Sequence, residues 1–292
     1  MAESSYVFLN ELRLHYLHWN LADGKRFMVL LHGLASNARI WELVAPYLVE
    51  RGFAVVAPDA RGHGLTDKPD GNYSFDVFTR DLAALVNAFD LEQPILVGHS
   101  WGASIVLDYA ARFPLGRLAP ASIALVDGGA TQMDDLGLSW DEMRERLTPP
   151  RLAGLPVEAF LERLESHNSR WKPDRQAMQI ILANFEITED ETILPRLSFD
   201  NHMKIVRAMW EFKTYERFSR LNCPVLLVPA RPKEPLSPQE SQHLAFKERG
   251  VEEARQRIQD VRVQWMEDAI HDIPLQRPAE LAARLADFAS AI

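Results

Sequence analysis

The sequence predicts an α/β protein in which helices flank a mostly parallel sheet of eight strands, with a mainly helical segment inserted after the sixth strand. Two observations predict this class. Short apolar runs rich in β-branched residues alternate with segments of helical periodicity, which is typical of βαβ units. The alternation stops after residue 129 and resumes near residue 220, as expected for one long insertion.

The composition excludes several classes of protein. A chain of 292 residues, 47% of them hydrophobic, can bury a large core. The formal net charge of -9 argues against nucleic acid or an anionic membrane surface as partner, because both attract basic patches. The single cysteine, Cys223, allows no internal disulfide and fits a reducing compartment.

No segment of the sequence predicts contact with a membrane. The first twenty residues lack a basic stretch followed by an apolar run, and no apolar run is long enough to span a bilayer. We therefore expect a soluble, cytoplasmic protein with no membrane insertion.

The chain opens with a predicted antiparallel hairpin. Residues 6–10 and 12–19 each alternate apolar and polar side chains and are separated by a tight turn. The alternating βα part follows. Its first two units comprise a strand at 26–33, a helix near 38–51, a strand at 53–59 and a helix near 75–89.

The helix near 75–89 has a clear amphipathic pattern. Phe78, Leu82, Leu85 and Phe89 lie on one face, and Ser74 is the predicted N-cap. The remaining predicted strands are "PILVGH" at 94–99 and the segments 122–129, 223–230 and 261–267. The remaining predicted helices run from Trp101 to about Phe113, near 238–259 and from Pro278 onward.

The inserted segment is predicted to be a cap. We expect a core domain of residues 1–129 and 220–292 and a mainly helical cap of residues 130–219, in which residues 185–197 form a small hairpin. The cap carries many large apolar side chains, which either line a pocket or pack between the cap's own helices and the core. They are Met133, Trp140, Phe160, Trp171, Met178, Phe185, Met203 and Trp210.

One short motif points to chemistry. In "GHSWG", Ser100 lies between Gly98 and Gly102 where a buried strand is followed directly by a helix. A turn this sharp strains the backbone of Ser100 and leaves no space for flanking side chains. It also places the hydroxyl at the carboxyl edge of the sheet, beside the free N–H groups of the helix N-terminus. The pattern predicts that Ser100 is a nucleophile.

Three further motifs accompany this one in a fixed order. They are "LLHGLASNARIW" at 30–41, "PDARGHGLTDKP" at 58–69 and "AIHDIPLQRPAELAARLADF" at 269–288. Together with "GHSWG" they resemble the α/β-hydrolase superfamily, specifically its capped, esterase-like serine hydrolases. The resemblance covers nearly the whole chain and implies the α/β-hydrolase fold.

The resemblance implies a role for several residues. Ser100 would attack a carbonyl carbon, and His271, in the loop after the eighth strand, would take its proton. The backbone N–H groups of Leu34 and Trp101 would form the oxyanion hole, and the indole of Trp101 is expected to face the site or the cap. Four other residues are expected to be structural and to pair within their own turns, namely Asp59, Arg61, His63 and His99; His32 is expected to organise its loop.

Two residues compete for the role of the acid that holds His271. Relatives place this carboxylate after the seventh strand or after the sixth. The seventh strand is followed only by Glu234, in a proline-rich loop, whereas Asp127 ends the sixth strand and precedes two glycines. A charge that ends a buried strand needs a partner, and a histidine across the sheet edge is one. Asp127 is therefore favoured over Glu234.

The predicted function is hydrolysis of a small, fairly apolar carboxylic ester, lactone or thioester through an acyl-enzyme intermediate. A carbon–carbon bond hydrolase, an amidase or a cofactor-free perhydrolase on the same fold is the alternative, and a non-catalytic ligand-binding protein is the third reading. The sequence has no metal-ligand cluster, phosphate loop or dinucleotide fingerprint, so no cofactor is expected. The oligomeric state is left open.

Overall fold

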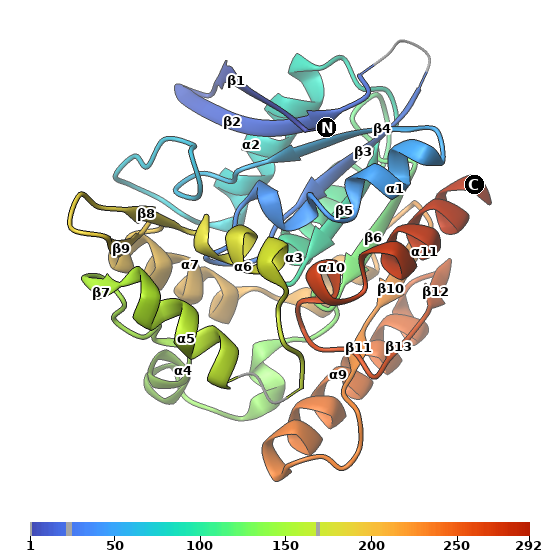
Figure 1. Cartoon of the computed structure of the whole chain (residues 1–292). Helices are drawn as coiled ribbons and strands as arrows, with labels where there is room; N and C mark the ends of the chain where they lie inside the picture. Colours follow the sequence, from blue (N-terminus) through green and yellow to red (C-terminus); the bar gives the residue numbers. More distant parts are fainter. Residues whose placement is uncertain (1, 22–24, 168–169) are drawn as a thin grey trace.

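The computed structural model describes residues 2–21, 25–167 and 170–292. Figure 1 shows a twisted sheet of eight strands with helices on both faces. The predicted α/β class, with its mostly parallel sheet, is confirmed. In spatial order the strands are β1 (Glu3–Leu9), β2 (Leu12–Trp19), β4 (Phe53–Pro58), β3 (Arg26–Leu31), β5 (Ile95–His99), β6 (Ser122–Val126), β10 (Val225–Val228) and β12 (Val261–Val263).

The opening hairpin forms as expected. β1 pairs antiparallel with β2, and β2 pairs antiparallel with β4. Asn10 and Glu11 connect the two strands with φ of 48° and 58°, which matches a two-residue turn of the kind whose twist suits a hairpin. From β4 to β12 all neighbouring strands are parallel.

The parallel strands are buried on both faces, which explains their continuous apolar sequences. In β3, Val29 and Leu31 pack into one core, whereas Met28 and Leu30 pack into the other. The helices that pack into the first core include α2 (Phe75–Ala88), α3 (Trp101–Arg112), α8 (Thr214–Phe218) and α9 (Pro238–Arg257). Those that pack into the second include α1 (Ala45–Glu50), α10 (Ile273–Gln276) and α11 (Pro278–Ser290).

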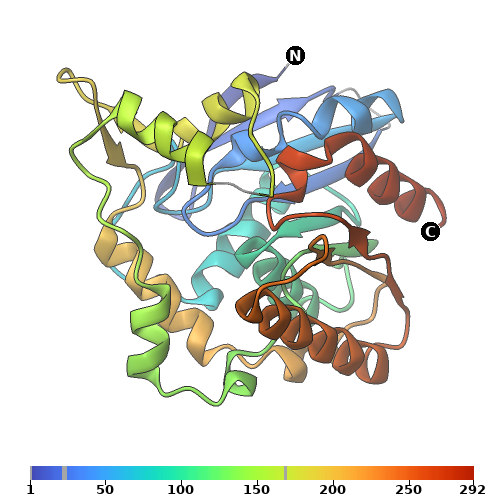
Figure 2. The ribbon, with the colours of Figure 1, turned by 60° about the horizontal axis from the view of Figure 1, so that its bottom comes forward.

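Residues 130–219, which we call the cap segment, add no strand to the main sheet within the described residues. Most of them gather along one side of the molecule, away from α11 (Figure 2). Besides α8, the segment contains η2 (Met133–Leu136), α4 (Trp140–Leu147), β7 (Leu155–Pro156), α5 (Val157–His167), α6 (Arg175–Leu182), β8 (Phe185–Ile187), β9 (Thr192–Pro195) and α7 (Phe199–Glu211). The predicted hairpin at 185–197 is β8 and β9; β7, which was not predicted, pairs with β9.

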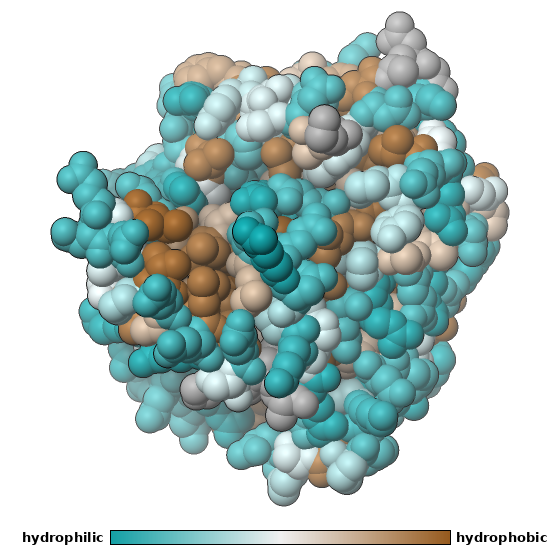
Figure 3. All heavy atoms as spheres, viewed as in Figure 1, coloured by the Kyte–Doolittle hydropathy of each residue, from teal (hydrophilic) through white to brown (hydrophobic). Residues whose placement is uncertain are grey.

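Large apolar side chains of the cap segment pack against one another and against the main cores, as Trp171 does against the second core. The rings of Phe160 and Phe185 are 4.8 Å apart, and those of Trp140 and Trp210 are 6.4 Å apart. Figure 3 shows a further apolar patch on the surface near β8 and β9, where Ile187 and Leu194 are exposed.

Two predicted helix features differ in the structure. The helix near 38–51 is divided into the 3-10 turn η1 (Ala38–Trp41) and α1. Pro46 causes the division, because proline lacks an N–H and fits the first turn of a helix but not its interior. Ser74 is the N-cap of α2, but its side chain makes no capping hydrogen bond.

The last predicted strand, at 261–267, is also divided. Its first part is β12, and its second part, β13 (Met266–Glu267), pairs with β11 (Ala230–Arg231) as a separate two-stranded ladder. Pro229 interrupts the neighbouring strand, and it has no N–H to continue the ladder. Within the ranges described, no helix is long and apolar enough to cross a membrane.

Candidate active site

Ser100 occupies a strained turn between β5 and α3. Its backbone has φ of 55° and ψ of -121°, a combination that residues other than glycine rarely adopt. A Cβ on Gly98 would lie 2.3 Å from the carbonyl oxygen of Gly102, and a Cβ on Gly102 would lie 2.4 Å from that of His32. Both glycines are therefore required sterically, as the sequence predicted.

Asp127 lies beside Ser100 because β5 and β6 are neighbours. His99 pairs with Val126, and the Ser100 N–H donates to the Val126 carbonyl oxygen at 2.9 Å. Asp127 follows with φ of 43°, which turns the chain away from the sheet. Gly128 then packs so closely that a Cβ there would lie 2.1 Å from the carbonyl oxygen of Ser100.

His271 joins the two side chains, although it lies more than 140 residues away in sequence. Its Nδ1 lies 2.6 Å from Asp127 Oδ2, and its Nε2 lies 2.9 Å from Ser100 Oγ. Since a carboxylate only accepts, Nδ1–H donates to Asp127 and Nε2 is left to accept the hydroxyl proton of Ser100. The arrangement is able to remove a proton from Ser100.

His99 positions the backbone of His271. Its Nε2–H donates to the carbonyl oxygen of His271 at 2.9 Å. Burial lowers the pKa of His99 to about 4, so the ring is neutral near pH 7. The expectation that His99 is structural therefore agrees with its contacts, but its partner is not within its own turn.

The charges at the site favour a carboxylate facing an imidazole. Burial acts to raise the pKa of Asp127, but the hydrogen bond from His271 and the positive charges of His271 and Lys247 lower it far below its ordinary value. Desolvation acts to lower the pKa of His271, yet the hydrogen bond and charge of Asp127 raise it above 6.5. The side chain of Asp127 is fully buried, while that of His271 is 51% exposed.

The structure brings Asp127, and not Glu234, to His271. Asp127 Oδ1 also accepts the Ala230 N–H at 2.8 Å, and Lys247 Nζ lies 2.7 Å from the same oxygen. Glu234 is exposed, and its carboxylate accepts the N–H of Leu236 in its own loop. Lys247 is a site residue that the sequence reasoning missed.

The two predicted oxyanion donors lie around Ser100. Leu34 follows Gly33, at which a Cβ would lie 3.1 Å from Ser100 Cβ. No hydrogen bond joins the Leu34 N–H to any of the residues that the structure describes. Trp101 is the first residue of α3, where backbone N–H groups have no partner within the helix. Both amides therefore lack a hydrogen-bond partner among the described residues.

His32 organises the loop that carries Leu34, as expected. Its Nδ1–H donates to the Gly33 carbonyl oxygen at 2.8 Å, and its Nε2 accepts the Ala60 N–H at 3.0 Å. Burial lowers the pKa of His32, which fits a neutral ring in this role.

The expectation of pairing within the turn is confirmed for Asp59, whose Oδ2 accepts the Leu65 N–H at 2.8 Å, but it is wrong for Arg61. Asp59 lies 2.7 Å from His15 on β2, and Arg61 lies 2.8 Å from Asp81 on α2. The buried charges find these partners on neighbouring elements because the sheet brings those elements together. His63 also bonds within the turn, donating from Nδ1 to the Arg61 carbonyl oxygen at 3.0 Å.

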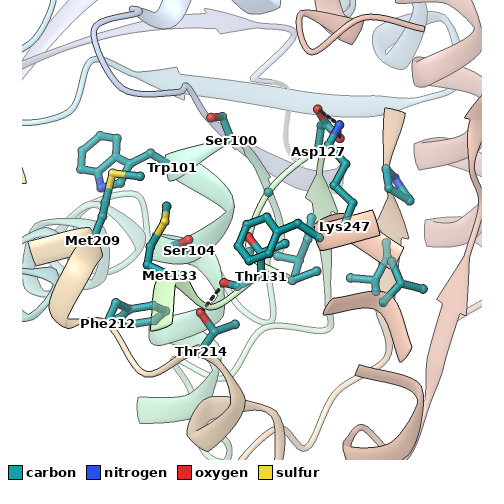
Figure 4. A pocket seen from close by; sticks show the side chains of 18 of the residues that line it. Ser100, Trp101, Ser104, Asp127, Thr131, Met133, Met209, Phe212, Thr214 and Lys247 are labelled. Carbon is teal, nitrogen blue, oxygen red and sulfur yellow. Dashed lines mark hydrogen bonds and ion pairs between the residues drawn. The ribbon is translucent and has the colours of Figure 1, made fainter. Parts of the chain in front are cut away.

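A cavity of about 170 Å³ opens beside Ser100. Figure 4 shows Trp101, Met133, Met209 and Phe212 along one side of it, with Asp127 and Lys247 at the other. The indole of Trp101 is buried and stacks on His63 with 5.2 Å between ring centroids. Of the eight large apolar cap side chains singled out in the sequence, Met133 is the one that lines this cavity.

No group of three or more His, Cys, Asp or Glu side chains that could hold a metal ion is found among the described residues.

Comparison with known proteins identifies the family. The profile of the Alpha/beta hydrolase family matches residues 28–284, which is most of the chain. This chain belongs to the alpha/beta hydrolase family. The resemblance to the α/β-hydrolase superfamily seen in the sequence motifs, and the fold that it implied, are thereby confirmed.

The curated relatives of this alpha/beta hydrolase match part of it. It is 34% identical over 142 residues to the non-heme chloroperoxidase of Streptomyces lividans, covering 47% of this chain and 51% of that protein. It is 39% identical over 87 residues to the 2-(acetamidomethylene)succinate hydrolase of Mesorhizobium japonicum, covering 30% of this chain and 31% of that protein. The chain spans about a third to a half of the length of the curated relatives it matches.

Solved structures share the fold of this alpha/beta hydrolase over its whole length. E-2-(acetamidomethylene)succinate hydrolase superposes with a TM-score of 0.75 and 21% identity, covering 99% of this chain and 100% of its own. At this identity the likeness shows the fold alone.

Proposed function

We propose that this alpha/beta hydrolase is a serine hydrolase that cleaves a small, fairly apolar carboxylic ester, lactone or thioester. The observation that carries the proposal is the hydrogen-bonded series from Asp127 through His271 to Ser100, at the mouth of an apolar cavity. In this proposal Ser100 is the nucleophile, His271 the general base and Asp127 the acid that holds His271.

The first half of the proposed reaction forms an acyl-enzyme. Ser100 Oγ attacks the substrate carbonyl carbon while its proton passes to His271 Nε2. The backbone N–H groups of Leu34 and Trp101 stabilise the negative oxygen of the tetrahedral intermediate. His271 then gives the proton to the departing alcohol or thiol, and the acyl group remains on Ser100 as an ester.

The second half releases the acid. A water molecule gives a proton to His271 Nε2 and attacks the acyl carbon, and a second tetrahedral intermediate forms in the same oxyanion hole. Its collapse returns the proton from His271 to Ser100 Oγ. The enzyme is then restored, and the products are a carboxylic acid and the alcohol or thiol released before.

The cavity supports the substrate class. Its walls include the apolar side chains of Phe75, Met209 and Phe212, which favour an apolar group by removing it from water. Its volume of about 170 Å³ supports a small substrate.

The same nucleophile would also serve a carbon–carbon bond hydrolase, an amidase or a perhydrolase. A chloroperoxidase and a hydrolase of 2-(acetamidomethylene)succinate are among the proteins that this chain resembles. A substrate panel of esters, lactones, amides and β-diketones therefore separates these reactions from ester cleavage. A non-catalytic protein would turn over none of them.

The experiment follows p-nitrophenol release from p-nitrophenyl acetate and butyrate. We expect a burst equal to the enzyme concentration, labelling by a fluorophosphonate, and loss of both in Ser100→Ala. Ser104→Ala is the matched control for labelling, because Ser104 lines the same cavity one helical turn further along α3. Absence of both the burst and the label in the wild-type protein would refute the proposal.

A further inference from the structure

One buried charge beside the site has no part in the reaction above. Lys247 lies on α9, and its side chain is 12% exposed. Its Nζ lies 2.7 Å from Asp127 Oδ1, 2.9 Å from Asp127 Oδ2 and 3.2 Å from the Ala230 carbonyl oxygen. An ammonium group has three N–H donors. The three acceptors occupy all three N–H donors of Lys247, and two of the acceptors are the oxygens of Asp127. Lys247 is therefore directed at Asp127 and not at a substrate.

We infer that Lys247 is a positioning residue for the proposed triad. It holds the Asp127 carboxylate with Oδ2 facing His271, and its positive charge opposes the protonation of His271 that Asp127 favours. The inference rests on the function proposed above.

The first step of the argument concerns orientation. Asp127 Oδ1 accepts the Ala230 N–H, and Oδ2 accepts the His271 Nδ1–H. Lys247 contacts both oxygens and thereby bridges them, as Figure 4 shows for the Asp127 and Lys247 side chains. Without this bridge, Oδ2 is held by His271 alone, and the carboxylate is freer to rotate away from the imidazole.

The second step concerns charge. The Asp127 side chain is fully buried, and a buried carboxylate without a positive partner is costly. In the resting state His271 must be neutral to act as a base, so Lys247 supplies the balancing charge. If Lys247 is removed, His271 is the nearest group able to supply that charge, and it does so by taking up a proton.

The third step considers every group facing His271. Two groups raise its pKa, namely Asp127 at the end of β6 and the adjacent Asp272, while Lys247 lowers it. The two remaining groups are histidines, His99 at the end of β5 and His243 on α9, and burial lowers the pKa of both. Lys247 is thus the ammonium group in this set.

The test measures the pKa of His271 directly, by NMR titration of isotope-labelled imidazole groups, with His271→Asn used for assignment. We expect Lys247→Met to raise the pKa of His271 by about 1 unit or more, because the positive charge that is removed opposes protonation of the imidazole. Lys247→Arg keeps the charge and is expected to restore the wild-type value closely.

Activity gives a second readout. In Lys247→Met, the acidic limb of the pH profile of kcat/KM should move upward with the pKa of His271, and kcat at its plateau should fall. Lys233→Met is the matched control: it removes the same charge from the exposed loop before α9, and its profile should coincide with that of the wild type.

The outcomes separate the two claims. An unchanged His271 titration in Lys247→Met, or an equal shift in Lys233→Met, would overturn the role of Lys247. If circular dichroism shows that Lys247→Met is unfolded, Lys247→Gln, which keeps N–H donors without the charge, must give the same upward shift. Absence of ester hydrolysis by the wild-type protein would overturn the proposed function instead, because the titration requires no turnover.

Discussion

Asp127 combines three properties at one position: a left-handed backbone, a fully buried carboxylate and a hydrogen bond of 2.6 Å to His271. We expect Asp127→Asn to lower kcat by about 10⁴, because an amide neither stabilises the imidazolium nor selects the tautomer that accepts the serine proton. Glu234→Gln, at the exposed alternative position, should leave kcat within about twofold of the wild type. Steady-state kinetics with p-nitrophenyl butyrate measures both, and equal effects would contradict the assignment.

The charges around His271 set the pH range of the reaction. Asp127 raises the pKa of His271 above 6.5, and the base must be unprotonated, so activity should be present at high pH and lost as pH falls through a value above 6.5. Burial keeps the pKa of His99 near 4 and that of His243 below 6.5, which leaves His271 as the histidine titrating on this limb. A profile of kcat/KM between about pH 5 and 9 with an uncharged ester checks this; a limb below 6 would contradict it.

The sequence identified some site residues more readily than others, for physical reasons. Ser100 is marked by the two glycines that its turn requires, and His271 by its place after the last strand. Asp127 and Glu234 could not be separated with certainty, since their choice depends on which loop turns toward His271. Lys247 was missed, although it lies at helical spacing with buried Gly250, Val251 and Ala254. A lysine on the buried face of a helix is the signal that would have found it.

The turn after β6 packs directly against the turn after β5 that carries Ser100, and the candidate site depends on this contact. Gly128 follows Asp127, and a Cβ there would lie 2.1 Å from the Ser100 carbonyl oxygen. We expect Gly128→Ala to destabilise the protein by about 1 to 3 kcal/mol by overpacking and to slow fluorophosphonate labelling of Ser100 at least tenfold.

Gly116→Ala is the control for this substitution. Gly116 has φ of 89° and open space around its Cβ position, so alanine there introduces backbone strain of about 1 to 2 kcal/mol but no clash. Labelling at the wild-type rate is expected. Urea unfolding and labelling kinetics compare the two variants, and wild-type labelling in Gly128→Ala would refute the steric account.

The succession of strands and helices was predictable from periodicity alone, because apolar runs buried on both faces of a parallel sheet have a clear signature. The breaks within one predicted helix and one predicted strand were not predictable from periodicity. They occur at Pro46 and Pro229, where a missing N–H divides a helix and a strand that hydrophobicity alone would continue. β7 has two residues, too few for any period to be detected.

At the scale of the whole molecule, the cavity is shared between the main sheet and the cap segment. Met209 and Phe212 come from the cap segment, and the ring of Phe212 lies 4.1 Å from that of Phe75 on α2. We expect Met209→Ala to enlarge the cavity and to raise kcat/KM for p-nitrophenyl hexanoate relative to the acetate by about tenfold.

Met178→Ala provides the comparison, because Met178 is a half-buried methionine of the cap segment that does not line the cavity. Its ratio of hexanoate to acetate should equal that of the wild type. A changed ratio in Met178→Ala, or an unchanged one in Met209→Ala, would mean that another surface sets the chain-length preference.

Ser100 and Asp127 are supplied by adjacent, directly paired strands, with Ser100 N–H bonded to Val126. The loop at 232–236 therefore contributes no side chain to the proposed triad. It lies before the capping box of α9. It is a place where an epitope or a fluorescent tag is expected to be accommodated while turnover continues.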